Sequence, residues 1–272
     1  MSDRQGKSQK AIRLGTHGED YGSWMSNPVF YMVGGLAVLA VLLAILSFAV
    51  FHISILGILF AIIIAGLLVV LIWITWIRRQ YAFDGGGIME QVHQTILDHL
   101  DYDGRGTLLD VGCGSGALSI RAALTWQETK VVGIDYWAAV YNYSQALCEK
   151  NAASEGAGDR CTFCHGDANK LDFPDGSFDA VVSNYVYHNI TGADKQQLLL
   201  ETLRVLKKGG VFALNDEMKP GMYGDMEAFA KKLRDMGYEE VRLIDTAKEV
   251  FGSHRRAAMM MLGESRMLVG RK

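Results

Sequence analysis

The chain has 272 residues, of which 50% are hydrophobic, and a formal net charge of −3 at pH 7. This length accommodates one sizeable α/β domain with an appendage. The mildly acidic balance disfavours nucleic acid as a partner, because no basic stripe is available to follow phosphates. Residues 1–28 are polar and aperiodic, and we expect them to form a flexible cytoplasmic tail.

Residues 29–77 contain no Asp, Glu, Lys or Arg. At about 1.5 Å per residue, one helix of this length would exceed twice the ~30 Å hydrocarbon core of a membrane. A break at His52-Ile53-Ser54 gives two transmembrane helices, at about residues 29–51 and 55–77. Two buried helices of a soluble core are the alternative, but apolar residues on every helical face disfavour it.

Basic residues flank this stretch, and aromatic residues lie at its two ends. The short turn has neither Lys nor Arg, so the positive-inside rule places both termini in the cytoplasm. We therefore predict a multi-pass protein of the cytoplasmic membrane whose domain at residues 78–272 is cytoplasmic. The flanking basic residues are Arg4, Lys7, Lys10, Arg13, Arg78 and Arg79, and the belt aromatics are Trp24, Tyr31, Trp73 and Trp76.

The four cysteines are expected to be reduced in the cytoplasm. The segment from Cys161 to His165 has the pattern C-x-x-C-H of a haem attachment site. Residues three apart on a strand point to opposite faces, so both thiols cannot easily reach one porphyrin. We expect neither haem nor a structural metal.

Helical and strand patterns alternate in the second part of the chain. Apolar residues at four-residue steps predict a helix over 88–100. A doubly wound, mostly parallel sheet follows from this alternation. The predicted strands are 107–111, 130–134, 161–165, 178–183, 211–215, 240–244 and 265–270. The later helices are 117–124, 137–153, 195–206, which Gly209-Gly210 would stop, and 225–236.

The first predicted strand leads into a glycine-rich turn, LLDVGCGSGALS, at residues 108–119. Gly112 and Gly114 with Ala117 fit a dinucleotide-binding loop, whereas the same glycines with Asp110 and Gly116 fit a loop that binds S-adenosylmethionine (SAM). Glycines let the backbone approach a ligand and adopt positive φ. The turn alone therefore leaves both cofactors open.

Asp135 ends the second strand, nineteen residues after Gly116, where an acidic side chain can accept both ribose hydroxyls of either cofactor. Further motifs favour SAM: GDA at 166–168, FPDGSFDAVVSN at 173–184 and LRVLKKGG at 203–210. With the glycine loop, and in this order, they resemble the class I SAM-dependent methyltransferases, in particular the small-molecule, type 11-like branch. The resemblance covers about residues 83–272 and implies a Rossmann-like sheet of seven strands with the last antiparallel.

The resemblance also implies a role for each matching residue. Gly112, Gly114 and Gly116 would lie along the methionine part of SAM. Asp110 would order the loop and bind the cofactor's amino group, and Asp135 would hold the ribose.

On the adenine side, Asp167 and the Ala168 amide would bind the base, and Tyr136 or Trp137 would cover it. Ordinary packing at a helix start is the alternative role for these two aromatics. Asn184 would lie beside the sulfonium. Tyr81 and Phe83 are candidate lid residues, on a looser match.

A thiolate or amine acceptor needs little beyond positioning, whereas an oxygen or carbon acceptor needs a base within hydrogen-bond reach. His188 is the first candidate, and Tyr185, Tyr187, Asp216 and Glu217 are the others. A lone histidine more commonly satisfies backbone groups.

Residues 253–262, SHRRAAMMML, predict a short helix capped by Ser253. We hypothesise a membrane-adjacent lid, with adaptable Met side chains and Arg side chains for an anionic head group. Met in the core and Arg in solvent is the plain alternative.

The sequence thus predicts a membrane-anchored methyltransferase acting on a small, hydrophobic or membrane-associated acceptor: a lipid, quinone-like molecule, thiol or amine. The alternatives are an NAD(P)-dependent oxidoreductase on the same fold and a non-catalytic SAM-binding membrane protein. The oligomeric state is left open, because the small residues of the hairpin permit packing within or between chains. These are Gly34, Gly35, Gly57, Ala61 and Gly66.

Overall fold

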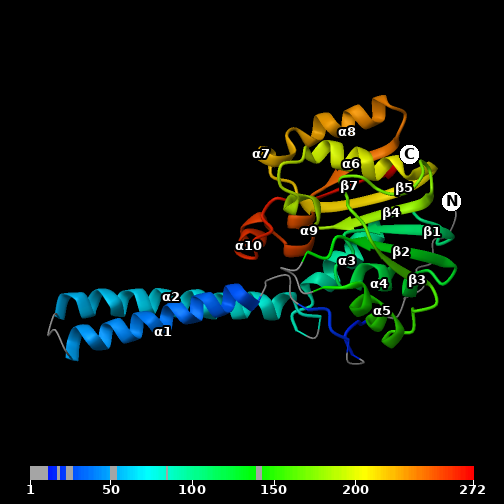
Figure 1. The fold of residues 1–272 in the computed structure, drawn as a ribbon. Helices are drawn as coiled ribbons and strands as arrows, with labels where there is room; N and C mark the ends of the chain where they lie inside the picture. Colours follow the sequence, from blue (N-terminus) through cyan, green and yellow to red (C-terminus); the bar gives the residue numbers. More distant parts are fainter. Residues whose placement is uncertain (1–11, 17–18, 23–26, 50–53, 84, 139–142) are drawn as a thin grey trace.

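The computed structural model describes residues 12–16, 19–22, 27–49, 54–83, 85–138 and 143–272. It has two parts, an α/β domain and a long hairpin of two helices that projects from one side of it (Figure 1). The hairpin helices are α1 (Asn27–Ala49) and α2 (Ser54–Tyr81). The break expected around His52 lies outside the described residues.

The domain is built on one seven-stranded sheet in the order β3-β2-β1-β4-β5-β7-β6. Its first five strands are parallel, and β7 is antiparallel to both of its neighbours. The doubly wound sheet with an antiparallel last strand is confirmed. The strands are β1 (Gly106–Val111), β2 (Thr129–Asp135), β3 (Cys161–His165), β4 (Phe178–Asn184), β5 (Leu206–Glu217), β6 (Glu239–Ile244) and β7 (Ser265–Arg271).

Helices cover both faces of this sheet, because alternate residues of each strand point to opposite sides. Leu108 belongs to the core shared with α3, α4 and the base of the hairpin, whereas the next residue, Leu109, belongs to the core under α6 and α8. The helices are α3 (Ile88–His99), α4 (Ala117–Thr125), α5 (Gln145–Ser154), the 3₁₀ turn η2 (Tyr187–Asn189), α6 (Lys195–Arg204), α7 (Pro220–Tyr223), α8 (Met226–Asp235), α9 (Thr246–Phe251) and α10 (His254–Met259).

Two helix predictions need correction. The helix expected over 137–153 begins only at Gln145, where the Ser144 hydroxyl accepts from the Leu147 amide as an N-cap. Trp137 instead has a φ of 45°, outside the helical range. The helix expected over 195–206 ends at Arg204, and Gly209-Gly210 lie within β5 rather than stopping a helix. There Gly209 donates to the Lys272 carbonyl, so strand pairing takes the place of the helix stop.

The N-terminal segment is not a free tail where the structure describes it. Leu14 and Tyr21 are buried. The Gly15 amide and the Tyr21 hydroxyl both donate to Oε1 of Glu155, at 2.8 and 3.0 Å, and the Tyr21 ring lies 4.7 Å from that of Phe83. Residues 12–16 and 19–22 therefore pack on the domain, contrary to the expected flexibility. Contacts this distant in sequence leave no local pattern to find.

The hairpin leaves most of its apolar surface uncovered. Only 22% of the most apolar window in α1 and 6% of that in α2 are buried, so most of each helix lies outside the core of the domain. Both are long and apolar enough to cross a membrane, by length and composition. At the far end, the Phe48 ring occupies the space a Cβ at Gly57 would need, whereas Gly34, Gly35 and Gly66 have open space around them.

Candidate active site

The glycine loop lies at the carboxyl end of β1 and leads into α4. Gly112, Gly114 and Gly116 have φ values of 75°, 57° and 85°, in the left-handed region that favours glycine. A Cβ on Gly112 would lie 2.2 Å from Cγ2 of Val186. Gly116 is the N-cap of α4 and has no side chain to bond the first helical amides. The loop therefore offers close backbone approach and uncapped N–H groups to an anionic ligand group.

Asp135 holds this loop from the end of β2. Its Oδ2 accepts from the Gly114 amide at 2.8 Å, and its Oδ1 accepts from the Trp137 amide at 2.6 Å. The Trp137 indole in turn donates to the Gly114 carbonyl at 2.9 Å. A carboxylate has about four acceptor positions, so Asp135 retains capacity for two ribose hydroxyls. This arrangement fits the ribose and methionine parts of SAM.

Asp110 lies behind the loop and is buried. Its Oδ2 accepts from the Ser119 hydroxyl of α4 at 2.6 Å, which ties β1 to the helix that follows the loop. Burial raises the pKa of Asp110 to about 7. The contact matches the loop-ordering role, while a bond to the cofactor's amino group stays a prediction.

The adenine-side residues gather at the ends of β2 and β3. The Gly166 amide donates to the Asp135 carbonyl at 3.0 Å, and Oδ1 of Asp167 accepts from the backbone and side chain of Asn169. Tyr136 is 64% exposed, with its ring 5.2 Å from that of His165. Tyr136 is thus free to cover a base, whereas Trp137 is engaged with the loop. The role of Ala168 stays a prediction.

The two cysteines of the C-x-x-C-H segment pack against different cores. Cys161 contacts the core that includes Phe163 and Ala123, and Cys164 contacts the core that includes Leu109. These cores lie on opposite faces of the sheet, as a strand requires. One porphyrin edge cannot reach both thiols in this arrangement.

Asn151 of α5 is a site residue that sequence reasoning missed. It is buried, and its Nδ2 donates to the carbonyls of Ser115, in the glycine loop, and of Asp20, at 3.1 and 2.9 Å. Its Oδ1 accepts from the Asp20 amide at 3.1 Å. The N-terminal segment is thereby bonded to the same side chain as the loop. Nothing around Asn151 in the sequence marks it.

The acceptor side of the site lies at the ends of β4 and β5. Oδ1 of Asn184 accepts from Nδ2 of Asn215 at 2.9 Å. His188 lies in η2, with Nδ1 2.5 Å from Oδ1 of Asp216. Asp216 is fully buried and also accepts from the amides of Tyr187, His188 and Glu217. The structure therefore brings two of the predicted catalytic residues into one hydrogen-bonded pair.

Tyr185 links the acceptor side to the last strand. It has a φ of 56°, and its hydroxyl lies 2.7 Å from Oγ of Ser265. Burial raises its pKa, so the phenol stays protonated and is unsuited to act as a base. Burial also raises the pKa of the nearby Glu217, whose Oε2 has no partner among the described residues.

The two candidate lid residues have different contacts. Tyr81, at the end of α2, donates its hydroxyl to the Met260 carbonyl at 2.5 Å. Phe83 packs on Tyr21 and lies 5.7 Å from the His93 ring. Tyr81 thus connects the hairpin to the segment after α10, and Phe83 contacts the N-terminal segment.

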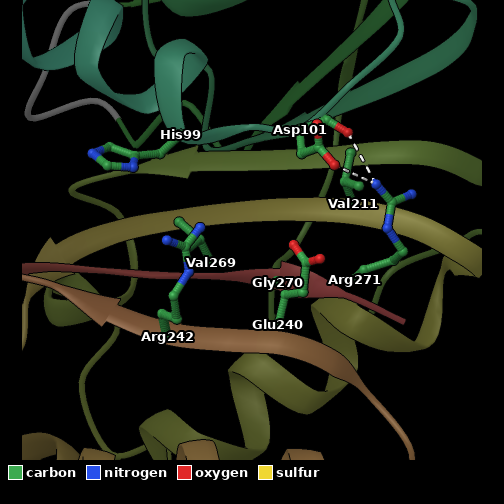
Figure 2. Close-up of a pocket in the computed structure, with 8 residues that line it drawn as sticks. All are labelled: His99, Asp101, Val211, Glu240, Arg242, Val269, Gly270 and Arg271. Atoms are coloured by element: carbon green, nitrogen blue, oxygen red, sulfur yellow. Dashed lines mark hydrogen bonds and ion pairs between the residues drawn. The ribbon is translucent and has the colours of Figure 1, made fainter. Parts of the chain in front are cut away.

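A separate hollow lies between the end of α3 and strands β6 and β7 (Figure 2). Its lining includes His99, Glu240 and Arg242, together with Arg271, which donates to Asp101 at 2.7 Å. It contains none of the residues at the carboxyl ends of β1, β2 and β4. Its mixed charges are those of a solvated surface.

Comparisons with known proteins agree with this geometry. A methyltransferase-domain family matches residues 109–214. The 27-O-demethylrifamycin SV methyltransferase of Amycolatopsis mediterranei is 27% identical over 191 residues, covering 69% of this chain and 67% of that protein. The demethylmenaquinone methyltransferase of Symbiobacterium thermophilum is 31% identical over 138 residues, covering 49% and 51%. The chain therefore spans about half to two thirds of the length of these relatives.

A solved geranyl diphosphate methyltransferase, in complex with GPP and sinefungin, shares the fold. Its TM-score is 0.53 at 16% sequence identity, covering 67% of this chain and 78% of that one. Fold, cofactor motifs and relatives agree. Residues 109–214 match a methyltransferase domain, the fold is that of the class I SAM-dependent methyltransferases, and the cofactor is SAM rather than a nicotinamide.

Proposed function

We propose that the chain is anchored in a membrane by its hairpin and transfers the SAM methyl group to a small, hydrophobic or membrane-associated acceptor. The pair of His188 and Asp216 is the observation that carries the chemistry. It favours an acceptor whose attacking atom must lose a proton, such as a hydroxyl or an acidic carbon, over an amine or a thiolate.

The hydrogen bonds of Asp216 determine the state of the histidine ring. Three backbone amides donate to Asp216, and His188 Nδ1 lies 2.5 Å from its Oδ1. Because a carboxylate only accepts, this contact assigns the proton to Nδ1 and leaves the lone pair of an uncharged ring on Nε2. The ring is about a quarter exposed, with 28% of its side-chain surface accessible. A base oriented in this way accelerates proton removal by roughly 10²- to 10⁴-fold.

When bound, SAM supplies a methyl group made electrophilic by the sulfonium. His188 Nε2 takes the proton of the acceptor as the acceptor's electron pair forms the bond to the methyl carbon. As the carbon–sulfur bond breaks, its two electrons stay on the sulfur atom. Asp216 stabilises the imidazolium that results, and Tyr185, as a neutral phenol, positions the acceptor beside Asn184.

The hairpin supports the membrane part of the proposal. The apolar surfaces of α1 and α2 are exposed, and Trp73 and Trp76, both partly exposed, lie near the end of α2 together with Arg78 and Arg79. Aromatic and basic residues are typical of a cytoplasmic membrane interface. The relative named for demethylmenaquinone adds support for a hydrophobic acceptor.

The test is the fate of a labelled methyl group. The full chain, reconstituted in vesicles, is incubated with methyl-labelled SAM and either an organic extract of cell membranes or an aqueous cell extract. We expect labelled product from the membrane extract, which mass spectrometry then identifies. Product from the aqueous extract alone would rule out the membrane-associated acceptor.

A further inference from the structure

The short helix α10 lies at the edge of the sheet where the acceptor side of the site is found. Ser265, the first residue of β7, pairs with Glu217, the last residue of β5, so the segment before it is next to the carboxyl end of β5. The Met218 amide donates to the Glu264 carbonyl there. In Figure 1, α10 and the hairpin lie on the same side of the domain.

One contact fixes the position of this segment relative to the hairpin. The Tyr81 hydroxyl bonds to the Met260 carbonyl. Residues 55–77 of α2 extend about 35 Å at 1.5 Å per residue, which matches a ~30 Å hydrocarbon core with some tilt. Tyr81 lies four residues beyond, about 6 Å further along the axis. If α2 spans the membrane, this depth is within the headgroup layer.

The exposed face of this segment combines basic and apolar side chains. Arg255, Arg256, Met259 and Met261 are exposed, and we name these four the docking face. Met259 lies four residues after Arg255 and three residues after Arg256, so the three side chains share one side of the helix. Ser253 caps the helix by accepting from the Arg256 amide, as the sequence predicts.

The docking face places exposed methionines next to arginines that have no ion-pair partner among the described residues. Met259 and Met261 are 53% and 48% exposed, whereas Met260 between them packs on the core. Neither arginine forms an ion pair within the described part of the chain, in contrast to Arg204, which bonds to Asp175 and Glu201. Two unpaired guanidiniums beside exposed methionines match an anionic headgroup layer above acyl chains.

We infer that the docking face lies on the anionic lipid headgroups of the same membrane that holds the hairpin. This inference rests on the proposed membrane anchoring. Docking would turn the carboxyl edge of the sheet, with His188 and Tyr185, toward the bilayer. An acceptor dissolved in the membrane would then reach the site without crossing bulk water.

Depth-dependent fluorescence quenching tests the inference on the full chain. Met259→Cys carries a fluorophore, and the chain is reconstituted in vesicles of phosphatidylcholine with about one third phosphatidylglycerol. Lipids with a spin label at the headgroup serve as quenchers. We expect strong quenching at position 259 and also in Met261→Cys. The unsubstituted chain, treated with the same reagent, gives the background from its own four cysteines.

Two further labels separate the possible failures. Met236→Cys is the matched control, because Met236 is 55% exposed and directly follows α8, a helix on the part of the domain away from the hairpin (Figure 1). Val69→Cys reports insertion of α2 through quenching by a spin label deep in the acyl chains. If the label at position 69 is quenched, but the label at position 259 is quenched no more than the control label at position 236, the docking face is wrong and the membrane anchor stands. Absence of quenching at 69 would overturn the membrane anchor as well.

The charge of the lipid tests the role of the arginines. In the labelled Met259→Cys chain, the double change Arg255→Ala and Arg256→Ala should lower quenching to the level at position 236. Vesicles of phosphatidylcholine alone should have the same effect on the chain that keeps both arginines. Quenching that depends on neither the arginines nor the anionic lipid would contradict headgroup binding.

Discussion

The cofactor half and the acceptor half of the site are built in different ways. In the cofactor half, Asp135 and Trp137 bond to backbone groups of a loop about twenty residues away in the same β-α-β unit. In the acceptor half, side chains from α2, η2, β5 and β7 come together over nearly the whole domain. A short motif can therefore identify the cofactor, whereas the acceptor depends on long-range packing.

The largest expected effect is on turnover in the acceptor half. His188→Gln should lower the rate of methyl transfer by roughly 10²- to 10⁴-fold and leave SAM affinity unchanged, since the described contacts of His188 are with Asp216 and the Tyr185 ring. Single-turnover transfer from labelled SAM measures the rate, and calorimetry measures SAM binding. A variant that turns over normally would remove His188 as the base. Loss of SAM binding would show that the two halves are not separable.

The next largest effect is expected in the cofactor half. Gly112→Ala places a Cβ 2.2 Å from Val186 at a φ of 75°, so we expect a loss of about 1–3 kcal/mol in stability, with weaker SAM binding. Gly221→Ala is the matched control, because a Cβ there meets nothing within 4 Å. The thermal midpoint without SAM measures the stability of each variant, and the rise in the midpoint on adding SAM measures SAM binding. Equal effects of the two changes would contradict a loop that requires glycine.

Asp110 gives the cofactor half a pH dependence. Its pKa is raised by burial to about 7 from 3.8, so the folded chain binds this proton more tightly than the unfolded chain. The ionisation of Asp110 therefore destabilises the folded state progressively as pH rises from about 4 to about 7. Asp110→Asn should lose this component. Denaturation at pH 5 and pH 8 measures the free energy of unfolding of both chains. If the difference between the two pH values is the same in Asp110→Asn as in the unsubstituted chain, Asp110 is not the source of the pH dependence.

The smallest effect concerns the N-terminal segment that lies over the cofactor half. Glu155→Ala removes the acceptor for the Gly15 amide and the Tyr21 hydroxyl, which should cost about 1 kcal/mol of local stability. Faster proteolysis within the N-terminal segment would report this loss of local stability. Glu149→Ala, in α5, is the control and should leave the cleavage rate unchanged. Equal cleavage of both variants would show that packing of Leu14 and Tyr21 alone holds the segment.

Sequence patterns alone predict the alternation of strands and helices, the sheet class, the cofactor loop and the apolar hairpin. Each depends on periodicity, glycine conformation or composition within a short window. Asp110, the three glycines and Asp135 are examples, because neighbouring residues carry the whole pattern.

The contacts between distant side chains, in contrast, depend on how the whole domain packs. Asn151 bonds to Asp20, Tyr81 bonds to Met260, and His188 pairs with Asp216, across separations of 131, 179 and 28 residues. Such contacts follow from how the layers pack, and burial then sets the state of the groups, as it raises the pKa of Tyr185. The packing of residues 12–16 and 19–22 on the domain was likewise decided by buried partners rather than by local composition.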